Sequence, residues 1–227
     1  MKKLMIIRTL SFALLLISLA GCKKVFDIAP QDQLDVTNAY QNVYDADAAV
    51  IGIYGKFMGL ADRYVLLNEL RGDLLDVTAN ADENLRQLST HTVTEANPYA
   101  SPKPFYELIL NCNDVLENFQ KMVAGNKMNI DQFNQRYSDI GALRSFLYLQ
   151  LGIHFGAVPY VTSSLKNVDD VKNAGNFPLV SFNVLLDSLI NFTEALPFKD
   201  KYPTGTNLNI SVDGYQTQKF FFKKKLI

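Results

Sequence analysis

One cysteine of the sequence stands in a setting that predicts covalent chemistry. Cys22 directly follows Leu19–Gly21, and this run closes an apolar stretch that begins at Leu10. Basic residues precede the stretch, so residues 1–21 are typical of a secretory signal peptide, and the apolar part is too short to span a membrane. The position of Cys22 matches the bacterial lipoprotein pattern, in which the thiol receives a diacylglyceryl group and the chain is cleaved before the cysteine. The alternative is an ordinary signal peptide or an uncleaved anchor with an incidental cysteine.

Lipidation would change both the charge and the location of the chain. Cleavage before Cys22 removes three basic residues and no acidic one, so the net charge changes from −1 to −4. Acyl chains on Cys22 would hold the chain at a membrane surface, since each buried methylene contributes about 0.8 kcal/mol. A negative net charge is not typical of nucleic-acid binding, and we therefore expect no nucleic-acid partner.

The other side chains that often perform catalysis do not form a recognisable constellation. The two histidines, His91 and His154, lie far apart, and the sequence has no HExxH, CxxC or glycine-rich phosphate loop. Cys112 lies on an apolar helical stripe, which predicts a small buried hydrophobe, and Asp169–Asp170 lies in a polar loop. We predict no enzyme, no metal site and no cofactor apart from the diacylglycerol on Cys22.

A long apolar helix is expected to organise the whole domain. Within Asp139–Pro159, apolar residues recur on most sides, which predicts a helix buried at the centre of a helical domain. Gly156 and Pro159 end it. Arg144 is the unusual residue of this helix, because a buried guanidinium needs acceptors. We expect a structural pair with Asp114, Glu117 or Asp139.

The segment before this central helix predicts a tether followed by a first helix. Residues 22–44 lack helical periodicity, and Asp45 is a plausible N-cap for the helix that follows. Gly59 is a plausible end of that helix. Gly52 and Gly55 inside it cost helix stability, so we expect them to allow a close helix contact.

A long polar excursion separates the first helix from the next pair. Ala61–Asn97 contains one short expected helix, Leu66–Arg71, and otherwise polar residues, and long loops of this kind often bind ligands. An amphipathic helix then runs from Pro102 to Gly125, and Asp131 is expected to cap the helix that leads into the central one.

These elements predict an all-α fold. Two long helices joined by a short loop form an antiparallel pair, the unit of TPR-like repeats, and a further helix is expected over Phe182–Leu196. The fold class is therefore TPR-like antiparallel helix pairs with long polar loops.

Three segments resemble the SusD/RagB family of Bacteroidetes outer-membrane nutrient-uptake lipoproteins. They are FYELILNCNDVLENF, DIGALRSFLYLQLGIHFGAVPYV and SFNVLLDSLINFTEALP. The start of the chain, with its lipoprotein signal, FDIAPQDQL and DADAAVIGIYGKF, matches the family as well. The family positions are met here by Phe105, Tyr106, Ile109, Asn113, Gly141, Ala142, Leu143, Arg144, Phe146, Tyr148, Phe155, Gly156, Val158 and Pro159.

The resemblance implies a role as well as a fold. It implies that residues 45–210 are a SusD-like N-terminal helical domain, anchored in the outer membrane through Cys22 and facing the outside. Such a protein binds oligosaccharides or other nutrients and delivers them to a SusC-like TonB-dependent transporter. Family members are considerably longer, so we interpret the aromatic and basic tail 211–227 as non-native, the product of truncation or a frameshift. Lys23 and Lys24 differ from the acidic residues common there in surface-exported lipoproteins.

The resemblance also implies where a glycan would bind. Sugars present hydroxyls at their rims and apolar C–H faces, so a site needs planar hydrogen-bonding groups beside an aromatic ring. The family places part of its site in the loop after the first core helices, which here indicates Arg71, Asp73, Asn80, Arg86 and Tyr99. The alternative for each is a solvated or capping role in the loop.

Two other function classes stay open. A TPR-like outer-membrane adaptor would bind a protein partner, and a continuous apolar groove on the concave helix face would favour it. A secreted hydrolase is the least favoured, because no catalytic constellation is present.

Overall fold

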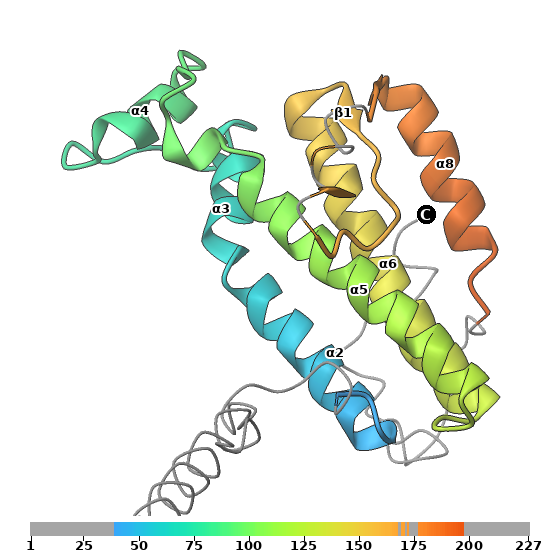
Figure 1. The fold of residues 1–227 in the computed structure, drawn as a ribbon. Coiled ribbons are helices and arrows are strands. Elements are labelled where there is room, and N and C mark those ends of the chain that lie inside the picture. Colours follow the sequence, from blue (N-terminus) through green and yellow to red (C-terminus); the bar gives the residue numbers. More distant parts are fainter. Residues whose placement is uncertain (1–38, 168, 171, 173–176, 198–227) are drawn as a thin grey trace, which may run out of the picture. The chain divides into compact units, whose positions relative to one another are not determined.

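Two long antiparallel helices form the centre of the structure, which is a computed structural model. α5 (Lys103–Ala124) and α6 (Ile130–Phe155) pack against each other and are joined by a short loop. α2 (Val43–Met58) contacts both helices, and α8 (Phe182–Glu194) packs against α6. Figure 1 shows α2 and α8 on opposite sides of the α5–α6 pair.

The structure describes residues 39–167, 169–170, 172 and 177–197. The predicted signal peptide 1–21, Cys22 and the predicted tail 211–227 lie outside these residues, so those predictions stay untested. From Tyr40 on, the described chain forms one unit. Within the described ranges, no helix combines the length and the apolar character that crossing a membrane requires.

The central helix α6 is buried on nearly every side, as its sequence predicts. Every residue from Ser138 to Gly152 is buried except two that are half-buried. Gly156 ends the helix with φ 74°, a conformation that glycine adopts without strain. The predicted cap was wrong: Asn129 caps the helix, and Asp131 lies in its first turn. The Asn129 side chain accepts from the Gln132 backbone, and the Gln132 side chain accepts from the Asn129 backbone, a reciprocal capping box.

The first helix begins earlier than expected. Asn42 is its N-cap, and Asp45, the predicted cap, is the acidic partner of the same capping box. The predicted tether 22–44 therefore overlaps α2 by two residues, because α2 starts at Val43. Gly59 follows the last helical residue, as predicted.

The close helix contact lies at different glycines from those predicted. A Cβ added to Gly52 or Gly55 would meet no atom within 4 Å, so these positions do not face a neighbouring helix. At Gly152 in α6, an added Cβ would lie 2.5 Å from the Phe182 ring and 2.9 Å from the Leu185 side chain, both in α8. The absence of a side chain at Gly152 therefore lets α8 approach α6.

The polar excursion is more ordered than its sequence indicates. α3 (Ala61–Val65) continues into a π-helix, η2 (Leu66–Leu70), close to the predicted short helix. The sequence reasoning missed α4 (Glu83–Ser89), whose N-cap Asp82 accepts from the Leu85 backbone at 2.9 Å. A single 3-10 turn, η3 (Pro98–Ala100), leads to α5. In Figure 1, α4 lies beyond the end of the helix bundle.

A short antiparallel ribbon closes the segment after α6. β1 (Val158–Pro159) pairs with β2 (Leu179–Val180), with Val158 opposite Val180 and Pro159 opposite Leu179. Two residues, Gly156 and Ala157, separate the end of α6 from β1, so the ribbon lies close to the end of α6.

Buried polar side chains bind the backbone that leaves α6. The Asn113 amide nitrogen donates to the carbonyls of Val161 and Ser163 at 3.0 and 3.1 Å, and its oxygen accepts from Arg144 at 2.8 Å. The Tyr148 hydroxyl donates to the Val161 carbonyl at 2.7 Å and accepts from the Val161 amide at 2.8 Å. Together Asn113 and Tyr148 hold the extended segment against α5 and α6.

The expected partners of Arg144 were wrong. Its guanidinium donates to the neutral amide of Asn113 and lies 4.3 Å from the Phe192 ring centroid, a cation–π contact. None of the described carboxylates forms an ion pair with it. Asp114 instead accepts from Ser164, and Asp139 accepts from Tyr54.

The predicted fold class is confirmed. The described elements are helices in antiparallel pairs with long connections, apart from the two-stranded ribbon.

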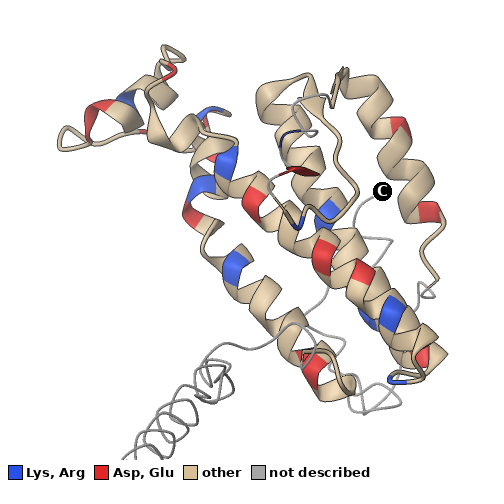
Figure 2. Ribbon diagram, in the orientation of Figure 1, with Lys and Arg blue, Asp and Glu red and all other residues tan. Residues whose placement is uncertain are grey.

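Cys112 is fully buried, as its position on the apolar stripe indicates, and burial raises the pKa of its thiol to about 12. Figure 2 shows acidic and basic residues interspersed along the described helices, in keeping with the net charge of −1.

Candidate functional site

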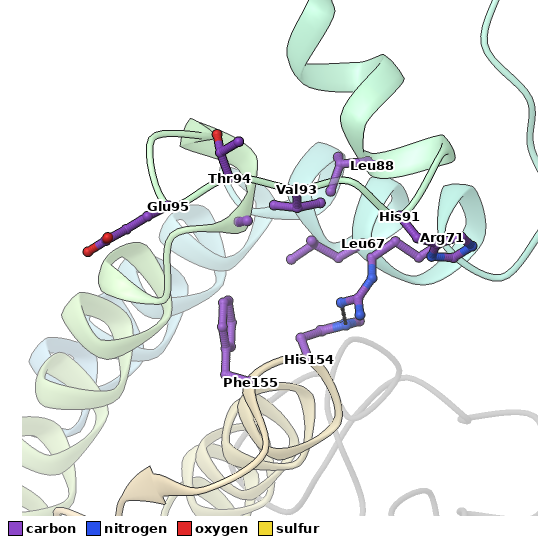
Figure 3. Close-up of a pocket in the computed structure, with 10 residues that line it drawn as sticks. Leu67, Arg71, Leu88, His91, Val93, Thr94, Glu95, His154 and Phe155 are labelled. Atoms are coloured by element: carbon purple, nitrogen blue, oxygen red, sulfur yellow. Dashed lines mark hydrogen bonds between the residues drawn. The ribbon is translucent and has the colours of Figure 1, made fainter.

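A pocket of about 360 Å³ lies between the polar excursion and the end of α6. That volume is within the range of small-ligand sites. The side chains drawn in Figure 3 come from η2 and the residue after it, from α4 and the loop after it, from η3, and from the last turn of α6. The lining residues are Leu67, Arg71, Leu88, His91, Val93, Thr94, Glu95, Ala100, His154 and Phe155.

One wall of the pocket is a chain of hydrogen bonds that joins η2 to α6. Arg71 approaches Nδ1 of His154 at 3.4 Å, and Nε2 of His154 lies 3.2 Å from the Gln150 amide oxygen. That oxygen also accepts from Asn68 at 3.0 Å. Because Arg71 can only donate, Nδ1 of His154 accepts, and the proton of the neutral ring is on Nε2. The wall is thus a half-buried guanidinium beside a neutral imidazole.

The ionisation of His154 follows from this geometry. Burial, with a further contribution from the Arg71 charge, lowers the pKa of His154 to about 4 from its ordinary value of 6.5. The ring is therefore neutral at pH 7. Protonation would place a proton on Nδ1, where Arg71 now donates.

The stability of the fold should depend on pH through His154. Between about pH 6.5 and pH 4 the unfolded chain binds a proton at this residue and the folded chain does not, so stability falls as the pH falls through that window. We expect His154→Gln to reduce the loss in free energy of unfolding between about pH 6.5 and pH 4 by about 1 kcal/mol. This figure is reduced because the side chain is only half-buried. Urea denaturation at several pH values between 4 and 7 would measure it. Equal slopes for both proteins would contradict the assignment.

The opposite wall and the floor are apolar. Leu67 and Leu88 are buried, and Val93, which also lines the pocket, is exposed. Figure 3 shows the Phe155 side chain pointing from the end of α6 toward Leu67 and Val93. The ring also packs edge to face on Phe105, with centroids 6.5 Å apart, so its orientation is held by the core. The pocket thus combines an aromatic wall with a hydrogen-bonding wall.

The rim beside Arg71 includes two residues with positive φ. Asp73 has φ 59° and His91 has φ 57°, and Nε2 of His91 lies 4.0 Å from a carboxylate oxygen of Asp73. Residues other than glycine adopt this conformation rarely, and such residues are enriched at functional sites. The contact also shows that the Asp73 carboxylate is directed to His91.

Of the residues predicted to bind a ligand, Arg71 lines the pocket and Asp73 contacts the lining residue His91. Asn80 is exposed before α4. The Arg86 guanidinium donates to the carbonyls of Ala81 and Ala79 at 3.1 and 2.6 Å, so it stabilises its own loop. Tyr99 is half-buried against the core.

Among the ten lining residues only Arg71 was predicted to bind a ligand, and the nine others include two histidines and one phenylalanine. Those three residues are His91, His154 and Phe155, and the last two belong to the end of the central helix. A polar and an aromatic residue directly before a helix-ending glycine were the available signal. His154 is half-buried and hydrogen-bonded to Gln150.

The described residues offer no cluster of three or more His, Cys, Asp or Glu side chains that could hold a metal ion. The lining offers hydrogen bonding by Arg71, apolar contact with Leu67 and Val93, and an aromatic surface at Phe155.

Comparisons with known proteins identify the fold. No protein-family model matches the sequence, and no curated protein gives a significant match. Among solved structures, a SusD-like protein of Bacteroides fragilis matches 78% of this chain and 33% of its own, with a TM-score of 0.60 and 16% identity. A SusD-like carbohydrate-binding protein of the same species matches 73% of this chain and 34% of its own, with a TM-score of 0.54 and 17% identity.

A third solved structure agrees with these two. A SusD homologue of Bacteroides thetaiotaomicron matches 69% of this chain and 30% of its own, with a TM-score of 0.51 and 19% identity. The chain therefore spans about a third of the length of the solved structures that it matches. At these identities the likeness concerns the fold, and it agrees with the resemblance seen in the sequence. The described part of this chain has the fold of SusD-like proteins.

Proposed function

We propose that this chain is part of a SusD-like lipoprotein that binds oligosaccharides and delivers them to a SusC-like TonB-dependent transporter. In this proposal the chain is anchored in the outer membrane by the diacylglycerol on Cys22, faces the outside and acts without catalysis. The fold supports the proposal, because one of the similar structures is described as carbohydrate-binding.

The composition of the pocket is the main structural support for a glycan. A sugar ring needs a flat apolar surface for its C–H face and planar donors or acceptors for its hydroxyls. Phe155 supplies the first and Arg71 the second, and both line the same pocket of about 360 Å³. Because Phe155 is packed on Phe105 and Arg71 contacts His154, both groups are oriented before a ligand binds.

One experiment tests anchoring and binding together. Cells producing the full-length protein should incorporate labelled palmitate and capture fluorescent oligosaccharides, and the Cys22→Ala variant should lose the label. The purified Cys22→Ala protein should still bind at least one oligosaccharide of a neutral and acidic panel, because the pocket lies far along the chain from Cys22. Palmitate labelling that survives in the variant would refute the anchor, and a panel with no binding member would refute glycan binding. Co-purification with a SusC-like transporter tests delivery.

A protein-binding adaptor is the second candidate, and one observation favours it. The outer face of α2 exposes Tyr44, Ile51 and Met58, with exposed fractions of 79%, 70% and 70%. These residues recur every seven positions, so they lie along one side of the helix. A protein partner captured by the wild type but not by Ile51→Glu, together with no glycan binding, would favour the adaptor.

A further inference from the structure

Arg71 differs from the other arginines that the structure describes. Arg136 pairs with Asp47 at 2.7 Å. The guanidinium of Arg144 donates to Asn113 and stacks on Phe192, Arg63 donates to the carbonyls of Pro98 and Tyr99, and Arg86 donates to those of Ala79 and Ala81. Within the described residues, the side chain of Arg71 has one hydrogen-bond contact, the long one to His154 at 3.4 Å.

Arg71 also has no ion-pair partner among the described residues. A guanidinium has five N–H donors, so most of those of Arg71 have no protein acceptor among the described residues. Two acids, Glu69 and Asp73, lie two residues away along the chain, and neither forms an ion pair with Arg71 among the described residues; Asp73 contacts His91 instead. Glu95 lines the pocket, but Figure 3 shows its side chain pointing away from Arg71. His154, in direct contact with Arg71, is a neutral acceptor. The pocket thus presents one half-buried cation whose remaining donors can bind an anion.

The other walls of the pocket restrict which kind of ligand can carry the anionic group. The guanidinium fork matches a carboxylate, with two parallel N–H···O bonds. Across the pocket, Phe155, Leu67 and Val93 offer apolar surface to a ring of moderate size. A ligand that satisfies both walls has a carboxylate at one edge of a ring with an apolar face.

We propose that the pocket binds an acidic sugar unit, a uronic acid whose carboxylate pairs with Arg71 while its ring lies against Phe155. This inference rests on the proposed glycan-binding function and specifies its ligand class. A sulfated sugar shares the anionic chemistry, and the experiment separates the two.

Titration calorimetry of the full-length protein in detergent tests the proposal. The ligands are short oligomers of galacturonic acid and of glucuronic acid, their methyl esters, the corresponding neutral oligosaccharides and heparin-derived sulfated oligosaccharides. Methyl esterification removes the charge and leaves the ring in place. The variants are Arg71→Gln, which can still donate to His154, and Arg71→Lys, which keeps the charge but not the fork.

Lys121→Gln is the matched control, because it removes the same charge from an exposed residue near the other end of α5. α5 begins at Lys103, close along the chain to the lining residue Ala100. Lys121 lies 18 positions further along the helix, about 27 Å away at the standard rise. Thermal melts of all variants confirm that each is folded.

Wild-type protein should bind at least one acidic oligomer about tenfold or more tightly than its methyl ester, the factor expected for a charged hydrogen-bonded pair. Arg71→Gln should remove that preference, Arg71→Lys should retain only part of it, and Lys121→Gln should leave it unchanged. Equal affinity of acid and ester for the wild type, or an unchanged preference in Arg71→Gln, would overturn the proposal. Tighter binding of the sulfated oligosaccharides through Arg71 would also overturn the uronic-acid assignment.

The outcomes distinguish this inference from the function on which it rests. Binding of neutral oligosaccharides without any preference for acids refutes the acidic ligand and leaves glycan binding intact. Failure of every member of the panel refutes both.

Discussion

Replacing Asn113 with alanine should destabilise the fold by about 3–4 kcal/mol. The substitution removes two buried hydrogen bonds and one partly buried one, and it leaves the Ser163 carbonyl and the buried Arg144 guanidinium without Asn113 as a partner. The Val161 carbonyl would still accept from Tyr148. Each buried polar group left without a partner costs about 1–3 kcal/mol, and more when it is charged. The loss should be large because the same side chain connects α5, α6 and the segment that follows α6.

Urea denaturation of the purified protein would measure this effect, and the melting temperature should fall by roughly 2–4 °C per kcal/mol. Asn111→Ala is the control, because this asparagine lies on the same helix, is partly exposed and bonds to Lys56 and to the backbone of its own helix. The control should change stability by less than about 1 kcal/mol, since alanine also favours the helix. Similar losses at both positions would show that the buried amide has no special role.

Replacing Gly152 with alanine should destabilise the fold by about 1 kcal/mol although alanine is the better helix former. The new Cβ would lie 2.5 and 2.6 Å from two atoms of the Phe182 ring and 2.9 Å from Leu185. Overpacking of this kind costs about 1–3 kcal/mol, and a helix gains about 1 kcal/mol from the change of glycine to alanine. The clash should exceed the gain because α8 would have to move away from α6.

Gly55→Ala is the matched control, since it makes the same change in a helix where nothing lies within 4 Å of the new Cβ. It should stabilise the fold by about 0.5–1 kcal/mol. Hydrogen exchange should show faster exchange in α8 for Gly152→Ala and no change there for Gly55→Ala. If both variants are stabilised, the α6–α8 contact is looser than the structure indicates.

Local patterns in the sequence were sufficient to predict most of the secondary structure. The apolar period predicted the buried central helix, and glycines predicted the ends of α2, α5 and α6. The missed element, α4, is a short helix without an apolar stripe, and only its cap, Asp82, indicated it. The two predicted caps were wrong because Asn42 and Asn129 precede acidic residues that are capping candidates as well.

The pocket and the helix contacts could not be predicted in the same way. His154 and Arg71 are distant in sequence, and only the packing of η2 on the end of α6 brings them within 3.4 Å. Composition could not show which glycine faces a helix, because Gly52 and Gly152 have similar surroundings in the sequence but only Gly152 meets α8.

The sequence by itself determined the helical class, the central helix, the burial of Cys112 and the excursion that contains part of the pocket, because these depend on residues close together in the chain. The tertiary structure decided the partners of Arg144, the neutral state of His154 and the absence of a carboxylate partner for Arg71 among the described residues. The physical reason is that ionisation and pairing depend on which groups lie within a few ångströms and on how much water is excluded, and both depend on how the helices pack.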